Sequence, residues 1–537
     1  MAARQCEHCG SFNIRPLSRF DPFAGDEDYF HNMPSRPART HFAGPDESYS
    51  ESRPQSRDVP LQSLGPSSDL EREAGHECKE SKKLDWDGPD DPENPQNWPT
   101  YKRRMQVILI ALITLVNNLA MTMFAPGASE LMAEFHSTSE TLGSLTVSIY
   151  VVGYVVGSSV LAPLSEMYGR LPIYSASVGL YAAFTIGCAF ATNLGMFIAF
   201  RLLAGCAASS TLVLCGGTLA DVIPKNDQGR WMSLFVLGPL AGPVIGPIAG
   251  GFIVQAIGWR WIFRIILMAY AAIAVLCIIF LRETYGTVIL RRRAVRRGQD
   301  LSALTQPGSA RSKFANDILR PIRLLIYSPI VLFLSLYAAF AFGLQFLLFT
   351  TFTDVFMNRY HWSVGVSGLA YVGLGIGMFA AVIAHTVCAE KIVRSRAAKN
   401  GGSKPEDRLP LMAYMAPALP IGMFWYGWSV EKTVHWIVPE LATAVVGVGI
   451  VFIMMPQMVY LVQVFGAEAG ASALAANTFL RYVAGAFLPL AGPAMYDKLG
   501  LGWGNSLLGF IGLAFIPIPW FLVIYGERMR LNGRINV

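Results

Sequence analysis

The sequence predicts an all-α membrane protein, with 12 transmembrane helices in two six-helix bundles, and three observations support this prediction. The chain of 537 residues is 53% hydrophobic and only 15% charged, whereas soluble domains carry roughly 25% charged residues. Its apolar residues fall into twelve blocks of roughly 20 residues, the length that crosses about 30 Å of hydrocarbon. A polar segment containing "RRRAVRRGQD" separates the first six blocks from the last six.

The apolar blocks define the expected spans and domains. The first-half spans are expected at 105–124, 142–161, 172–190, 194–219, 231–256 and 263–281. The second-half spans are expected at 329–352, 365–387, 410–428, 436–462, 471–490 and 506–524. The corresponding domains are a disordered cytosolic tail (1–95), the first bundle (96–285), a cytosolic central loop (286–327), the second bundle (328–526) and a cytosolic C-terminal tail (527–537). The N-terminal tail, residues 1–95, is expected to be disordered because its apolar residues do not recur at the spacing of a helix or a strand.

The distribution of Lys and Arg predicts the orientation in the membrane. Basic loops stay in the cytosol, and "YKRRM", "EKIVRSRAAKN" and "ERMRLNGR" all fall on one side of the predicted spans. We therefore expect a multi-pass protein of the cell membrane with both termini in the cytosol. The net charge of +6 follows from this bias and favours contact with anionic lipid over nucleic-acid binding.

No pattern in the sequence favours an enzyme. The "CEHC" of Cys6 to Cys9 has the spacing of half a zinc site, but no second pair stands at a suitable distance, so we expect neither a metal nor a cofactor. There is no nucleophile triad, and without a phosphate-binding loop the chain is not expected to be an ATP-driven pump.

The fourth span contains Arg201, within "FRLLAGCAASSTLVLCGGTLADVIP". A charge in hydrocarbon costs several kcal/mol unless it faces a paired or aqueous interior, so Arg201 is a candidate functional residue. The alternative is an arginine that snorkels to the outer interface six or seven residues away. Asp221 closes the same span, either as a helix cap or as an acid of the transport pathway.

The fifth span contains "GPLAGPVIGPIAGG", residues 238–251, with a proline at every fourth position. An interior proline removes a backbone hydrogen bond, which costs about 3 kcal/mol in a soluble helix. The glycines four residues apart form a stripe without side chains on one face. We therefore expect a bent, close-packed seam against neighbouring helices.

Several of these motifs resemble those of the major facilitator superfamily. The segment "APLSEMYGRLP" between spans two and three contains Glu166, Gly169 and Arg170 and resembles the family's loop signature G-x-L-x-D-R-x-G-R-R/K. It departs from that signature at Ala162, Glu166, Met167 and Leu171. Most of these substitutions fit the fungal twelve-span drug:H+ antiporters, but Leu171 does not.

The resemblance extends over residues 84–531 and implies roles for particular residues. "RLLAG" at Arg201 is similar to the fourth-helix motif whose arginine is implicated in proton coupling. The seam resembles the family's antiporter motif, which is associated with exporters; the residues that match it are Gly242, Pro243, Gly246, Pro247, Gly250 and Gly251. The resemblance also implies alternating access, with Glu166, Gly169 and Arg170 as a gating loop and Arg201 with Asp221 in proton coupling.

In such a fold, a central cavity lined by spans 1, 2, 4, 5, 7, 8, 10 and 11 would bind the substrate. The polar and aromatic candidates on these spans are Asn118, Tyr154, Tyr337, Gln345, Phe349, Gln457, Tyr460, Asn477 and Arg481. Aromatic, methionine and amide side chains suit amphipathic or cationic organic molecules. Ordinary helix packing explains most of these side chains equally well.

We therefore expect a proton-coupled exporter of drugs, toxins or secondary metabolites that acts as a monomer. Its expected partners are a small-molecule substrate, protons and the lipid bilayer, without nucleic acid. Two alternatives remain open at this point: an importer or facilitator of a nutrient or polyamine, and a membrane sensor that transports nothing.

Overall fold

The computed structural model describes residues 86–88, 90–224, 228–298, 310–400, 402 and 404–532, all within one compact unit. The predicted tail before residue 86, including the Cys6–Cys9 pair, and residues 299–309 of the predicted central loop lie outside the described residues.

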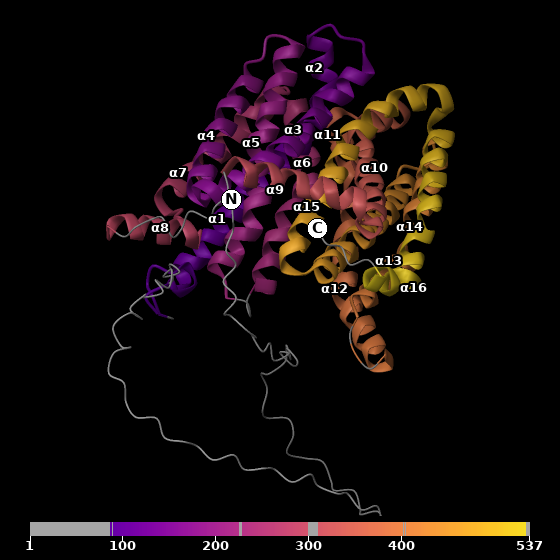
Figure 1. Ribbon diagram of the computed structural model, residues 1–537. Helices are drawn as coiled ribbons and strands as arrows, with labels where there is room; N and C mark the ends of the chain where they lie inside the picture. Colours follow the sequence, from indigo (N-terminus) through magenta and orange to yellow (C-terminus); the bar gives the residue numbers. More distant parts are fainter. Residues whose placement is uncertain are drawn as a thin grey trace, which may run out of the picture. The chain divides into compact units, whose positions relative to one another are not determined.

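The six helices of the first bundle follow the predicted spans closely (Figure 1). They are α1 (Thr100–Thr122), α3 (Glu140–Tyr168), α4 (Arg170–Ala189), α5 (Leu194–Val222), α6 (Gln228–Ile257) and α7 (Arg260–Phe280). The short helices η2 (Ala125–Gly127) and α2 (Ala128–Glu134) connect α1 to α3. We call the end of the bundles at which α1 begins the basic end, because Arg170 and the arginines after α7 lie there, and the end near α2 the opposite end.

The second bundle is less regular than the first. Its helices are α10 (Pro329–Tyr360), α11 (Val364–Ser367), η4 (Gly368–Tyr371), α12 (Val372–Asn400), α13 (Leu409–Met415), α14 (Ala418–Glu431), α15 (Ile437–Phe515) and α16 (Pro517–Asn532). The eighth span is divided among α11, η4 and α12, and the ninth between α13 and α14. The helix α15 contains the tenth and eleventh spans and part of the twelfth; Gly466 and Gly500 interrupt it with φ of 69° and 73°, a left-handed conformation that suits glycine.

Among the described residues, nine helices are long and apolar enough to cross a membrane. This number is smaller than the twelve predicted spans for three local reasons. The eleventh and twelfth spans form one continuous segment from Ala469 to Leu531, and only Ala241–Ile257 of the fifth span is counted, as a shorter apolar helix. The ninth span is interrupted after Met415.

The polar segment between the bundles contains two helices that were not predicted, α8 (Gly286–Arg296) and α9 (Ala310–Tyr327). Part of the predicted N-terminal tail (1–95) is also described: residues 86–94 lead into η1 (Pro95–Asn97), and Asp87 and Asp91 bind Arg293 of α8. At the other terminus, α16 continues to Asn532, past the predicted boundary at 526. The loop between the bundles is therefore largely helical where it is described.

Glycines bring pairs of helices into backbone contact inside each bundle. In the first bundle, a Cβ on Gly153 or Gly157 of α3 would overlap the backbone of α5, at Leu202 and Cys206. In the second bundle, a Cβ on Gly377 of α12 would overlap a carbonyl of α15. Small residues allow this approach in membranes, where helices pack without a hydrophobic driving force.

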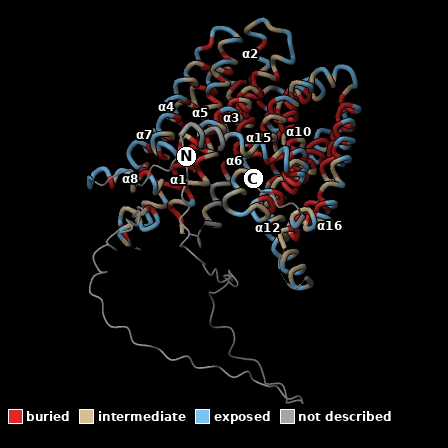
Figure 2. Tube along the Cα trace, viewed as in Figure 1, coloured by how far each residue is buried: buried red, intermediate tan, exposed pale blue. Residues whose placement is uncertain are grey.

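The Gly/Pro seam of α6 contacts both bundles. On one side, Gly242, Gly246 and Gly250 face α1, and Gly250 lies against the carbonyl of Met123. On the other side, Gly251 lies against the backbone of α11, and a Cβ on Gly368 of η4 would stand 2.7 Å from the carbonyl oxygen of Pro247. The helix α6 is therefore packed between α1 and the eighth span, towards the opposite end. Burial is concentrated where helices face one another (Figure 2).

Candidate functional site

Arg201 of α5 is fully enclosed in the first bundle, with 1% of its surface exposed. Its guanidinium donates hydrogen bonds to three backbone carbonyls: Ala120 at 3.1 Å, Met121 at 3.5 Å and Thr146 at 3.4 Å. The first two lie in the last turn of α1, where free carbonyls give the helix end a partial negative charge. Arg201 therefore caps α1 with a full positive charge and ties it to α3.

Aromatic rings surround the same guanidinium. Its central carbon lies 4.7 Å from the ring centre of Tyr150, 5.5 Å from that of Phe124 and 5.8 Å from that of Phe263. Arg201 forms no ion pair with any described residue. Because the side chain is enclosed by α1, α3 and α7, the alternative that it snorkels to the surface is wrong.

Arg170 connects three elements at the basic end. Its Nε lies 3.5 Å from a carboxylate oxygen of Asp221, and Nη1 donates to the Ser165 hydroxyl at 2.8 Å. The guanidinium also lies over the Tyr285 ring, at 5.2 Å. Two predicted groups, the loop residue Arg170 and Asp221 of the fourth span, therefore meet, whereas Glu166 is exposed.

Glu283, which follows α7, binds the turn between α3 and α4. Its carboxylate accepts from the backbone N–H of Arg170 at 2.9 Å and of Leu171 at 3.2 Å, which are the first N–H groups of α4. Gly169 has φ of 102° and lies against this carboxylate, so that a Cβ would overlap it. Glycine is thus required at position 169 both by its backbone conformation and by the lack of space.

The acidic segment before α1 forms a clasp with α8. Arg293 binds Asp91 at 2.5 Å and Asp87 at 2.6 Å, and Arg297 binds Asp87 at 2.7 Å. Asp91 also accepts the backbone N–H of Asp87 and of Glu93. The hydrogen bond from Arg293 is the main cause that lowers the pKa of Asp91 to about 2. We call Asp87, Asp91, Arg293 and Arg297 the clasp.

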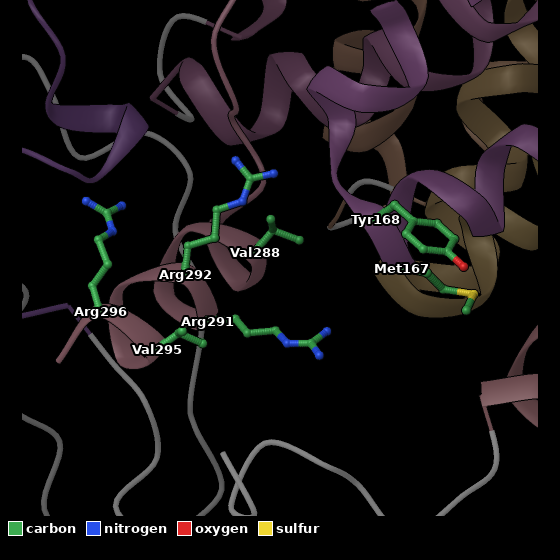
Figure 3. A pocket seen from close by; sticks show the side chains of 7 residues that line it. All are labelled: Met167, Tyr168, Val288, Arg291, Arg292, Val295 and Arg296. Atoms are coloured by element: carbon green, nitrogen blue, oxygen red, sulfur yellow. The ribbon is translucent and has the colours of Figure 1, made fainter. Parts of the chain in front are cut away.

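The other arginines of α8 face a surface groove of about 470 Å³ (Figure 3). Apolar side chains from the end of α3 and from α8 form the rest of its wall. The lining residues are Met167, Tyr168, Val288, Arg291, Arg292, Val295 and Arg296. The arginines of α8 and of the residue that follows it are therefore of two kinds: Arg293 and Arg297 are paired in the clasp, and the others line this groove.

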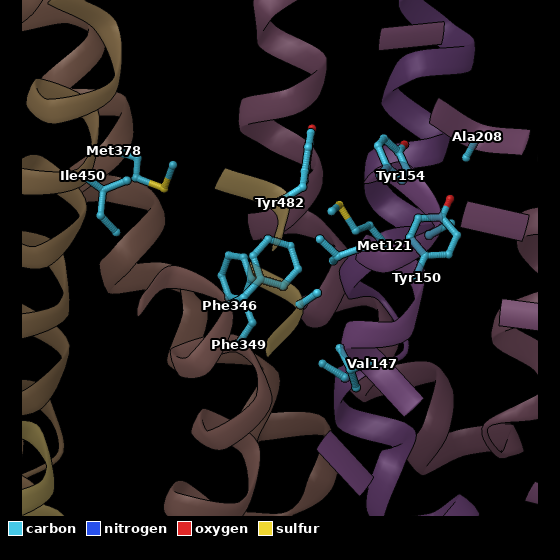
Figure 4. Close-up of a cluster of buried hydrophobic side chains, with 14 of the residues drawn as sticks. Met121, Val147, Tyr150, Tyr154, Ala208, Phe346, Phe349, Met378, Ile450 and Tyr482 are labelled. Carbon is cyan, nitrogen blue, oxygen red and sulfur yellow. The ribbon is translucent and has the colours of Figure 1, made fainter. Parts of the chain in front are cut away.

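An aromatic and methionine cluster occupies the region where the two bundles meet (Figure 4). The rings of Tyr154 on α3 and Tyr482 on α15 lie 5.6 Å apart, and Tyr482 also meets Phe342 of α10 at 5.1 Å. Phe346, Phe349 and Met121 lie nearby in the same view. The predicted cavity residues Tyr154 and Phe349 are therefore at this bundle interface.

The other predicted cavity residues are distributed over three environments. Asn118 faces Gly242 of the seam, and Gln345 contacts the sulfur of Met378 at 3.8 Å. Tyr337 stacks on Phe515, at 5.4 Å, in the interior of the second bundle.

Three more of the predicted cavity residues, all in the second bundle, are fully buried: Gln457, Tyr460 and Asn477. The hydroxyl of Tyr460 lies beside Gly526 of α16. Asn477 donates to the Ser335 hydroxyl at 3.4 Å, and neither amide atom of Gln457 has a hydrogen-bond partner among the described residues. Tyr337 and Tyr460 thus pack against the twelfth span, whereas Gln457 and Asn477 leave polar atoms unsatisfied.

Arg481, the last of the predicted cavity residues, is partly buried on α15. Its guanidinium carbon lies 5.1 Å from the ring centre of Phe342 and 5.3 Å from that of Tyr482. Among the described residues, Nη1 donates only to the sulfur of Met454, at 3.6 Å, and buried Nε has no hydrogen-bond partner. This arginine is the only cation among the predicted cavity residues.

The family model of the Major Facilitator Superfamily matches residues 110–489. The chain belongs to the major facilitator superfamily. The match runs from the first span into the eleventh, so it includes Arg201, the Gly/Pro seam and Arg481.

Similar members of the superfamily come from fungi. The chain is 51% identical over 460 residues to the MFS transporter fsa7 of Fusarium sp. (strain FN080326), covering 84% of this chain and 90% of the relative. It is 46% identical over 461 residues to the trichosetin biosynthesis cluster MFS transporter of Gibberella fujikuroi (strain CBS 195.34 / IMI 58289 / NRRL A-6831), covering 84% and 90%. The protein is thus a multi-pass membrane transporter of small molecules.

Among solved structures, the chain is similar to the D-xylose–proton symporter, with a TM-score of 0.62 and 16% identity over 78% of this chain and 97% of that one. At this identity the similarity shows the major facilitator fold alone. It confirms the predicted fold class, an all-helical bundle of the superfamily.

Two carboxylates of this superfamily member were not predicted from the sequence. Glu283 lies in "RETYG", directly after the sixth span, where nothing marks its contact with the distant turn at Gly169. Glu440 lies in the tenth span, is 8% exposed and accepts the backbone N–H of Gly373 at 2.8 Å. Its second oxygen has no hydrogen-bond partner. Glu440 could have been predicted from the sequence, because a charged residue within an apolar block is the same feature that identified Arg201.

Proposed function

We propose that this transporter exports small organic molecules of the secondary-metabolite class from the cytosol in exchange for protons, by alternating access. The observation that carries the proposal is the similarity, over 84% of the chain, to a fungal transporter of a biosynthesis cluster. The ordered prolines and glycines of α6 support it as well, because they match the motif associated with exporters in this superfamily.

Each group of predicted residues has a proposed role. Arg201 and Asp221 take part in proton coupling, and Glu166, Gly169 and Arg170 form the gating loop. The contact of α6 with α11 and η4 closes one end of the path between the bundles. Pro247 and Gly251 make this contact, whereas Gly242, Gly246 and Gly250 hold α6 against α1; together with Pro243 they are the residues proposed for the antiporter motif.

We propose that the basic end lies in the cytosol, that both termini lie there in a cell-membrane protein, and that the chain acts as a monomer. The arginines of α8 support this orientation because basic loops are retained in the cytosol. In intact cells, a cysteine at position 291 should resist an impermeant thiol reagent added outside. Labelling from outside would overturn the orientation.

The export proposal is tested by transport in proteoliposomes and cells. An imposed pH gradient should drive substrate movement by the wild type, and Arg201→Ala should abolish it. In a host lacking its own exporters, wild-type cells should accumulate less of the exported compound than cells with the variant. Transport that ignores the pH gradient would contradict proton coupling, and net accumulation inside cells would identify an importer.

A further inference from the structure

Arg481 has an uncompensated positive charge beside Tyr482, a residue of the interface between the two bundles. It lies near the middle of the eleventh span, between the interruptions of α15 at Gly466 and Gly500. No carboxylate of the described residues lies within 4.0 Å of its nitrogens. In the part of the chain that the structure describes, its guanidinium lies over two aromatic rings and donates to the sulfur of Met454, and Nε has no acceptor.

These contacts do not satisfy a guanidinium in a membrane interior. A thioether sulfur is a weak acceptor, and an aromatic face attracts a cation only through its quadrupole. A charge at this depth therefore needs a further partner, and intramembrane ionisable residues mark substrate and ion pathways. Arg201 shows the alternative arrangement, since three backbone carbonyls accept from it.

We infer that Arg481 binds the negatively charged group of the exported molecule, so that the substrates are amphipathic organic anions. The inference rests on the proposed export function. A guanidinium presents parallel N–H donors that fit a carboxylate, whose charge is spread over two oxygens. Binding such an anion supplies the missing acceptor at Nε and the missing counter-charge together.

The surroundings of Arg481 fit the rest of such a molecule. Phe342, Tyr482 and Tyr154 form a row of rings, with ring centres 5.1 Å and 5.6 Å apart, that reaches from one bundle to the other. Arg481 lies over Phe342 and Tyr482, and the ring surfaces of Tyr154, Phe346 and Phe349 lie beside them (Figure 4). These surfaces suit a flat or bulky apolar body. Gln457 lies one helical turn beyond Met454 and has an unpartnered amide N–H, which makes it a second donor in the same bundle.

Organic cations fit this site poorly despite its aromatic lining. Composition alone suggested them, because aromatic rings and methionines attract cations. Here Arg481 already occupies the faces of Phe342 and Tyr482, and a second cation would meet its positive charge at low dielectric. Such like-charge juxtaposition is a source of specificity against the wrong ligand.

The test compares two dyes with the same tricyclic core and opposite charge, the anion fluorescein and the cation rhodamine 123. Proteoliposomes receive the wild type, Arg481→Gln, Arg481→Lys or the control Arg264→Gln. Arg264 is a suitable control because it also stacks on aromatic rings, Trp261 at 4.9 Å and Phe190 at 5.9 Å, but lies on α7. The initial rate of dye movement under an imposed pH gradient is measured, with size-exclusion chromatography to check folding.

We expect the wild type to move fluorescein faster than rhodamine 123. Arg481→Gln should lower the fluorescein rate by about 10-fold or more, as expected for loss of a charge-assisted hydrogen bond, without lowering the rhodamine rate. Arg481→Lys should retain part of the fluorescein transport, and Arg264→Gln should remain within about twofold of the wild type. If the glutamine variant fails to fold, the fluorescein rate of Arg481→Lys is compared with that of the wild type instead.

Two results would overturn the inference alone: a wild type that prefers rhodamine 123, or an unchanged fluorescein rate in folded Arg481→Gln. A folded wild type that moves neither dye would instead count against the proposed export function, and the inference would fall with it.

Discussion

Arg201 in the first bundle and Arg481 in the second both lie within membrane-spanning helices of this transporter, and they differ in what they contact. Arg201 is 1% exposed and donates to three backbone carbonyls of α1 and α3. Arg481 is partly buried and contacts two aromatic rings and one sulfur. Both stack on aromatic side chains, so the difference lies in their hydrogen-bond acceptors.

This difference separates a cation that holds helices together from one that is available to a ligand. The carbonyls of Ala120 and Met121 are free because α1 ends at Thr122, and Arg201 satisfies them. The same helix end packs on the seam, where Gly250 lies against the Met123 carbonyl. Arg201 therefore connects the core of the first bundle to the helix that contacts the second.

The largest expected effect is the loss of stability when each arginine is replaced, because only Arg201 donates to backbone carbonyls. Arg201→Leu should lower the free energy of unfolding by about 3 kcal/mol or more, because it leaves buried carbonyls without donors. Arg481→Leu should cost at most about 1 kcal/mol, because it removes a charge that has no strong acceptor. Both losses are measured by heating the detergent-solubilised variants and using size-exclusion chromatography to determine the fraction that remains folded at each temperature. Equal losses in the two variants would contradict the distinction.

Glu440 extends the comparison to an acid of the second bundle. One oxygen accepts from Gly373 N–H, and the other has no partner. Glu440→Gln keeps an acceptor for that N–H and removes the unpaired carboxylate, so its stability should equal or exceed that of the wild type. Glu440→Ala loses the acceptor and should cost about 1–3 kcal/mol.

The same thermal unfolding assay measures both Glu440 variants. Glu431→Gln is a matched control, because Glu431 also accepts backbone N–H groups, those of Leu501 and Gly502, at 3.0 and 3.2 Å. A large destabilisation by Glu440→Gln would show that the carboxylate has a charged partner that the contacts do not reveal.

The sequence allowed prediction of features that depend on composition along the chain. Blocks of apolar residues identify the spans because the hydrocarbon thickness sets their length. The spacing of glycines and prolines in α6 identified a packing seam because helical geometry places every fourth residue on one face. Arg201 was singled out because any charge in an apolar block is costly.

Features that depend on distant partners could not be predicted in this way. The acceptors of Arg201 are backbone carbonyls, which have no sequence signature. Glu283 reaches a turn more than 100 residues earlier in the chain, and the clasp joins Asp91 to Arg293 across 202 residues. Nothing local distinguishes Arg481 from Arg201, so only their contacts separate the two roles.

The smallest expected effect concerns the arginines at α8, outside the membrane. Here too, some arginines have bound partners and others do not. Arg293 and Arg297 are bound by Asp87 and Asp91, whereas the groove arginines have no ion pair with a described residue. Asp91→Asn should loosen α8 locally at neutral pH. Hydrogen exchange of the α8 amides should become faster, with little change in the global unfolding temperature. Glu390→Gln is a control, because Glu390 pairs only with Arg394 on the exposed surface of α12.

Acid should produce the same local effect in the wild type, and the sign follows from the pKa of Asp91. Binding to Arg293 lowers this pKa from 3.8 to about 2, so the folded state favours the charged carboxylate. The stabilisation is therefore fully present above about pH 4 and is lost as the pH falls through about 2. Between pH 5 and 8 the exchange of α8, corrected for its intrinsic pH dependence, should stay constant. A change in the corrected exchange rate between pH 5 and 8 would show that a group other than the clasp determines the local stability of α8.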